Sequence, residues 1–155
     1  MKKTFYILTL CTFLVACKNG PGESGNAELQ TEFEQLEEAT IEKHDVVMKE
    51  MNTLSSLSGK LSMVKDSTPS QTENNIAQKA DMYKKQVDVA HERMMVWMRS
   101  YGEDFPYNYS LPRNADSAKA AIQTMKSHHE EISNLEENTM NSIKEAREFL
   151  DNIKG

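Results

Sequence analysis

Three stretches of the chain place apolar residues at intervals of three and four, the spacing that brings side chains to one face of an α-helix. The first stretch spans about residues 27–66 and the third about 115–154. Thr68-Pro69 breaks the chain between the first and second stretches, and Ser70 with Glu73 forms a capping box that predicts the start of the second helix. Gly102 is a natural residue to end that helix.

The second stretch has the most regular apolar stripe, because its steps of four and three continue without a gap, as in a coiled-coil seam. That stripe comprises Ile76, Ala80, Tyr83, Val87, Ala90, Met94, Trp97 and Tyr101. The first stripe comprises Phe33, Leu36, Thr40, Val47, Met51, Leu54 and Leu61. The third comprises Ala118, Ile122, Met125, His129, Ile132, Ile143, Ala146 and Leu150. Glu136, beside Leu135, interrupts this third stripe and predicts a slip of its register by one residue.

These patterns predict an all-α fold, since no segment shows the alternation typical of a strand. Short connections make consecutive helices antiparallel, so we expect an up-down-up three-helix bundle with coiled-coil-like packing and crossing angles of roughly 20°. The second connection contains Phe105, Tyr107 and Tyr109, which makes it unusually aromatic. We expect it to fold over the end of the bundle near Trp97, with these four aromatic residues as packing or contact residues.

The beginning of the chain has a different pattern. Lys2 and Lys3 precede an apolar run over residues 4–16, which is too short to span a bilayer and is typical of a signal sequence. The run ends in Leu14-Val15-Ala16-Cys17, which resembles the lipobox of bacterial lipoproteins. The resemblance implies a signal peptide over residues 1–16 and a diacylglyceryl and acyl lipid on Cys17. An ordinary secretory signal with a chance cysteine is the alternative.

Residues 17–26 are rich in Gly, Pro, Ser and Asn, so we expect a flexible tether between the lipidated cysteine and the bundle, which occupies residues 27–155. The lipid anchor indicates the cell envelope, most simply the outer membrane, on either its periplasmic or its surface face. Removal of residues 1–16 leaves 16 basic and 24 acidic residues, a formal charge of −8. This charge argues against nucleic-acid binding and against a polybasic membrane patch.

Two segments resemble a known family. Residues 41–51 contain His44-Asp45 followed by Val47-Met48 and Met51, and residues 90–98 contain Met94-Met95-Val96-Trp97-Met98. Both are similar to stretches of small helical lipoproteins of Bacteroidota that are commonly named viral A-type inclusion proteins. The resemblance covers most of the mature chain and implies a lipid-anchored helical protein, but it implies no activity. The chain differs at Val96, where the family usually has Asp, and at Val46, where it often has Glu.

The motifs of most enzyme classes are missing. His91-Glu92 begins like the zinc-protease motif His-Glu-x-x-His, but Met95 stands in place of the second histidine. Asp88 and His91 have the spacing of one di-iron ligand pair, whereas a di-iron bundle needs two pairs. There is no phosphate-binding loop and no Gly-x-Ser-x-Gly motif. We therefore expect no enzymatic activity.

A metal site is the main chemical hypothesis. A first helix face contains His44, Met48 and Met51, and a second nearly contains His91, Met94, Met95 and Met98. If the first connection centres near Thr68-Pro69, His44 lies level with residue 93. Thioether and imidazole together suit Cu(I), and an indole can cover such an ion. Core packing by methionine is the more ordinary explanation, and non-covalent haem is a further alternative.

The sequence thus predicts a non-enzymatic envelope lipoprotein whose helical bundle serves protein interaction or structural support. The alternative is a metal-binding lipoprotein with a Cu(I)-type site. The expected partners are the membrane, through the lipid, and a protein.

Overall fold

The chain forms three long helices. The structure is a computed structural model that describes residues 21–67 and 74–153, and α1 spans Pro21–Ser67, α2 Asn74–Asp104 and α3 Ala115–Asn152. No β-strand occurs within these residues. The signal sequence, Cys17 and the proposed capping box at residues 70–73 lie outside the described residues.

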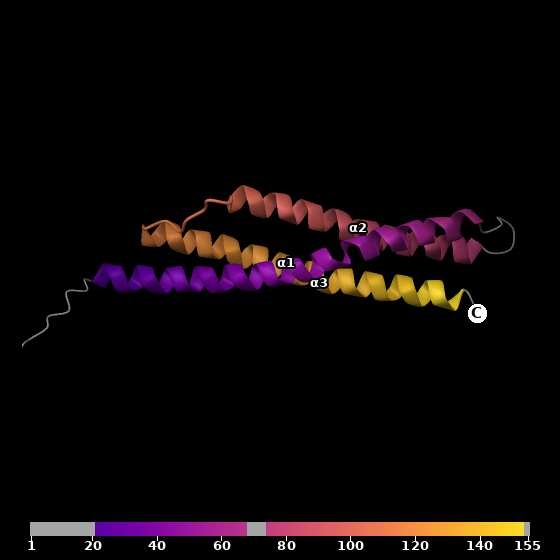
Figure 1. Cartoon of the computed structure of the whole chain (residues 1–155), viewed down its shortest axis with the longest axis horizontal. Coiled ribbons are helices and arrows are strands. Elements are labelled where there is room, and N and C mark those ends of the chain that lie inside the picture. Colours follow the sequence, from indigo (N-terminus) through magenta and orange to yellow (C-terminus); the bar gives the residue numbers. More distant parts are fainter. Residues whose placement is uncertain (1–20, 68–73, 154–155) are drawn as a thin grey trace, which may run out of the picture.

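The helices run up, down and up, and each of them packs against the other two (Figure 1). The start of α1 and the connection between α2 and α3 lie at one end of the bundle. The end of α1, the start of α2 and the end of α3 lie together at the opposite end. This arrangement confirms the predicted three-helix bundle.

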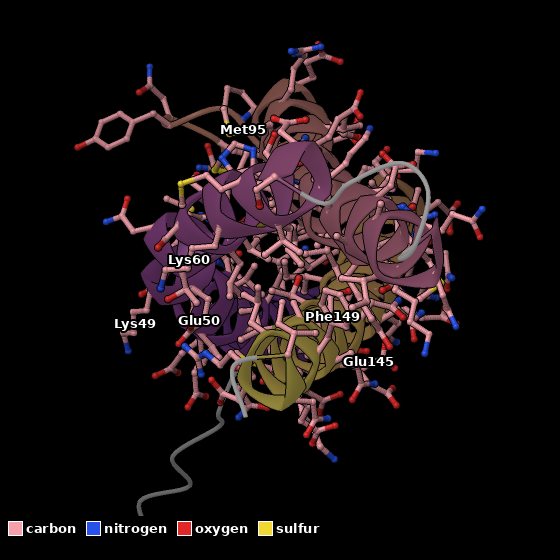
Figure 2. All side chains as sticks on the ribbon, turned by 90° about the vertical axis from the view of Figure 1, so that its right-hand side faces the viewer. Lys49, Glu50, Lys60, Met95, Glu145 and Phe149 are labelled. Carbon is pink, nitrogen blue, oxygen red and sulfur yellow. The ribbon has the colours of Figure 1, made fainter. Side chains whose placement is uncertain are left out.

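The core consists of the apolar stripes of the three helices. Every residue of the α2 stripe predicted from the sequence is buried or half-buried. Figure 2 shows Phe149 among the three helices, whereas Lys49, Lys60 and Glu145 lie at the outer surface. The side chains that are almost wholly buried include Val47, Leu54, Leu61, Val87, Met94, Met125 and Ile132.

The stripe of α3 passes through Leu135, which is buried, and not through Glu136, which is half-buried, as the predicted register slip of one residue requires. Leu135 and Thr139 are both buried, and they fill the steps between Ile132 and Ile143. Thr139 escaped the prediction because it is polar, although its methyl group and small size allow it to pack in a helical core.

Two helix ends differ from the sequence predictions. α1 begins at Pro21, so residues 21–26, expected to belong to a flexible tether, are helical. Proline is well suited to a first helical turn, because an N–H at that position would have no partner within the helix. The side chain of Asn26 donates a hydrogen bond to the carbonyl of Arg113 (3.0 Å), which connects this part of α1 to the segment before α3. α2 continues through Gly102 to Asp104, where the N–H of Phe105 still bonds to the carbonyl of Tyr101 (2.8 Å).

Two polar contacts set the offset between α1 and α2. Nζ of Lys65 donates to Oδ1 of Asp81 (2.6 Å), and Oγ of Ser58 donates to Oδ1 of Asp88 (2.6 Å). In both pairs the residue numbers add up to 146. Because the two helices are antiparallel, a residue of α1 therefore lies level with the residue of α2 that brings the sum to 146. Hydrogen bonds from Lys65 and then Lys85 lower the pKa of Asp81 to about 2.

Candidate functional site

A layer of aromatic rings closes the end of the bundle at the α2–α3 connection. Phe105 is buried, and its ring lies 5.6 Å from that of Phe33 and 5.0 Å from that of Tyr109. Tyr101 links this group to Trp97, with ring centres 5.0 Å apart. Tyr107 is fully exposed instead. Three of the four aromatic residues singled out in the sequence therefore pack together, and Tyr107 does not join them.

His128 joins α3 to this layer. Its side chain is buried, Nε2 lies 2.8 Å from Oδ2 of Asp104, and its backbone carbonyl accepts a hydrogen bond from Nε1 of Trp97 (3.2 Å). Nδ1 is buried and has no hydrogen-bond partner among the described residues. The sequence pattern placed His129 in the buried stripe, but His129 is only half-buried. Its Nδ1 lies 3.2 Å from the hydroxyl of Thr40.

The ionisation of Tyr101 is strongly affected by this environment. Burial raises the pKa of Tyr101 to about 12, and the carboxylate of Glu37, which accepts a hydrogen bond from the hydroxyl, adds to the effect. Tyr101 therefore remains a neutral donor over the physiological pH range.

His44 lies at the edge of the same layer. Its ring packs against Trp97 with centres 5.7 Å apart, and its Nδ1 lies 2.9 Å from Oδ1 of Asp45. Of the other proposed ligands, Met94 is wholly buried and belongs to the core cluster around Trp97. Met98 packs against that cluster, and Met48 is partly exposed.

His91 lies elsewhere along the bundle. It lines a surface pocket with Ser55 and Ser58 of α1, which agrees with the sum of 146 found for the bonded pairs. His44 precedes Ser55 by 11 residues, which is roughly 16 Å along α1 at 1.5 Å per residue. The expectation that His44 lies level with residue 93 is therefore wrong, because the helices are offset further than a tight turn at Thr68-Pro69 would place them. The two histidines do not meet around one ion.

A groove of about 660 Å³ runs between α2 and α3. Val89 and Val96 form its exposed apolar wall on α2, and they are 45% and 53% exposed. Trp97 and Leu135 lie at its buried side. Arg93 and Glu131 also line it, so the groove carries charges of both signs. The sequence reasoning missed this groove, although the spacing of seven between Val89 and Val96 was a signal for it.

Comparison of the chain with protein-family models, with curated proteins and with solved structures found no match. In the parts of the chain that the structure describes, no group of three or more His, Cys, Asp or Glu side chains is arranged to hold a metal ion. None of the described helices combines the length and the apolar character needed to cross a membrane.

Proposed function

We propose that the chain is a non-enzymatic lipoprotein of the cell envelope, held at the membrane by a lipid on Cys17. In this proposal the bundle binds an amphipathic helix of another protein in the groove between α2 and α3. The groove is the observation that carries the proposal, because two exposed valines beside a buried tryptophan form an apolar surface with no covering element among the described residues.

The spacing of the exposed residues supports a helical partner. Met82, Val89 and Val96 follow one another at intervals of seven on α2, and all three are exposed. A repeat of seven matches the side chains of a second helix packed alongside, and binding of an amphipathic helix in an apolar groove is a common mode of recognition. The partner would complete a four-helix arrangement.

Charge supports specificity at the rim of the groove. Arg93 and Glu92 lie on the α2 side and Glu131 on the α3 side. A partner helix with charges of matching position and opposite sign would be selected over one without them, because like charges brought together at an interface are unfavourable.

Site-specific photocrosslinking in intact cells tests this proposal. A photoreactive residue at Val96 should give one discrete adduct with a second protein, whereas the same residue at Lys60, on the outer surface of α1 (Figure 2), should not. Val89→Glu should remove the Val96 adduct while leaving the helical content unchanged. Equal adducts from both positions, or an adduct of the chain with itself, would contradict the proposed partner.

A further inference from the structure

Four methionines lie at neighbouring positions along the contact between α1 and α2. The bonded pairs Lys65–Asp81 and Ser58–Asp88 are separated by seven residues on each helix, and two helical turns return to the same side. The next pair in this series is Met51 and Met95, and Met48 and Met98 have the same sum of 146. We call Met48, Met51, Met95 and Met98 the methionine quartet.

The methionine quartet is accessible from solvent. Met48 is 39% exposed and Met95 is 47% exposed, while Met51 and Met98 are partly buried against the core. Met95 lies on the outside of the bundle in Figure 2. The two pairs of methionines differ by three residues, or about 4.5 Å along the axis, so the four residues fall within about one helical turn of this contact. Met48 and Met95 are therefore surface residues whose sulfur atoms an ion can approach from solvent.

His44 adds an imidazole at one end of the methionine quartet. It precedes Met48 by four residues, which places both on one face of α1. Nδ1 of His44 lies 2.9 Å from Oδ1 of Asp45, and in the tautomer that donates this hydrogen bond to the carboxylate, Nε2 has a lone pair for a metal ion. Orientation of a histidine by a carboxylate in this way is typical of metal-ligating imidazoles. The ring of Trp97 packs against that of His44, with centres 5.7 Å apart.

We propose that thioethers of the methionine quartet, together with Nε2 of His44, bind one Cu(I) ion at the contact between α1 and α2, with no more than four of these five groups as ligands at one time. Thioether and imidazole are ligands that soft monovalent ions prefer, and the hard ions Mg²⁺ and Ca²⁺ bind oxygen instead. His91 is not a ligand in this proposal, because it lies in the pocket with Ser55 and Ser58, beyond the other end of the methionine quartet. The site does not depend on the groove between α2 and α3.

Titration with Ag(I), which shares the softness of Cu(I) and does not change oxidation state, tests the site. The full chain should carry Cys11→Ser and Cys17→Ser, so that no free thiol competes. The chain has one tryptophan, Trp97, and its fluorescence reports on the contact with His44. We expect quenching that saturates at one ion per chain, and the same stoichiometry with Cu(I) under reducing conditions.

Matched variants separate this site from general binding to sulfur. Met48→Leu, Met98→Leu and His44→Ala should each weaken binding by about tenfold or more, since even groups that only orient ligands have effects of this size. Leucine preserves volume, so the fold should survive. Met63→Leu, at an exposed methionine outside the methionine quartet, should leave the affinity unchanged. Equal effects of all methionine variants, the absence of saturable binding, or a loss with His91→Ala but not with His44→Ala would overturn the proposal.

Discussion

Trp97 takes part in the aromatic layer, lines the groove between α2 and α3 and contacts His44 beside the methionine quartet. Its ring contacts His44 and Tyr101, and its Nε1 bonds to the carbonyl of His128. The sequence predicted the burial of Trp97, because its position in the α2 stripe faces the core. The sequence did not predict its contacts with other helices, since spacing along one helix determines a face but not the residues that the face meets.

We expect Trp97→Ala to lower the free energy of unfolding by about 3–5 kcal/mol, the usual cost of removing a large buried aromatic side chain. Trp97→Phe should cost less, because it keeps one ring in the core, although it loses part of the buried volume and the hydrogen bond to the carbonyl of His128. Chemical denaturation followed by circular dichroism measures both. A loss below about 1 kcal/mol for Trp97→Ala would be typical of an exposed residue.

Tyr101 provides a prediction for alkaline pH. The pKa of Tyr101 is raised from its ordinary value of 10.0 to about 12 in the folded chain. Between these values the unfolded chain has lost the phenolic proton and the folded chain retains it, so the stabilising contribution is complete below pH 10.0 and is lost as the pH rises towards about 12.

The ultraviolet absorbance of tyrosinate measures this effect. Subtraction of the titration curve of Tyr101→Phe from that of the unmodified chain should leave one phenol that ionises near pH 12. In addition, Tyr101→Phe should flatten the fall of stability in that range. A difference curve centred near the ordinary value of 10.0 would show that the hydroxyl is not held by burial and Glu37.

The histidines of α3 show where sequence reasoning stops at this scale. His128 and His129 follow Met125 by three and four residues, and both spacings return to the same face of a helix. The choice between them depends on Asp104, which binds Nε2 of His128 from the end of α2. That partner is close only because α2 passes Gly102, which the sequence did not indicate.

At the level of the helices, two wholly buried threonines differ in their hydrogen bonding. The hydroxyl of Thr40 donates to the carbonyl of Leu36 (2.6 Å) and lies near Nδ1 of His129. The hydroxyl of Thr139 is buried with no hydrogen-bond partner in the described parts of the chain. Thr40 was expected in the α1 stripe, whereas Thr139 was missed because it is polar.

We expect opposite effects of the same substitution at these two positions. Thr139→Val should raise the free energy of unfolding by about 1 kcal/mol, because a buried hydroxyl without a partner is replaced by a methyl group. Thr40→Val should lower it by about 1 kcal/mol, because it removes a satisfied hydrogen bond. Both variants keep a β-branched residue of similar size, so helix propensity changes little. Urea denaturation compares them, and changes of equal sign would contradict the assigned hydrogen bonds.

For the whole molecule, the number, order and direction of the helices could be predicted from periodicity and short connections. The offset between α1 and α2 could not, because it depends on the polar contacts of Ser58 and Lys65 with α2 and on a connection whose length the pattern leaves open. The sequence pattern predicted that facing residues of α1 and α2 have numbers that add up to 137, whereas the bonded pairs add up to 146. This difference of nine means that His91 does not face His44. The corrected offset brings Met48, Met51, Met95 and Met98 to neighbouring positions instead, so the residues of the candidate site changed while its proposed chemistry and the fold did not.

The attachment of the molecule to the membrane is a prediction of the sequence alone, since Cys17 lies outside the described residues. The chain is acidic, with a formal charge of −6, so electrostatic attraction to anionic lipids does not favour binding. A lipid on Cys17 would then carry the membrane affinity, and more than one acyl chain makes such attachment stable.

Replacement of each cysteine separates this mechanism from others. Cells grown with labelled palmitate should incorporate label into the wild-type chain, which should sediment with membranes. Cys17→Ser should abolish the label and leave the protein uncleaved or soluble, because serine offers no thiol for the thioether. Cys11→Ser is the matched control: it lies within the predicted leader and should change neither label nor partitioning. If the Cys17→Ser protein is still cleaved and still sediments with membranes, the lipobox interpretation is wrong, and the bundle must be held in the envelope by its protein partner.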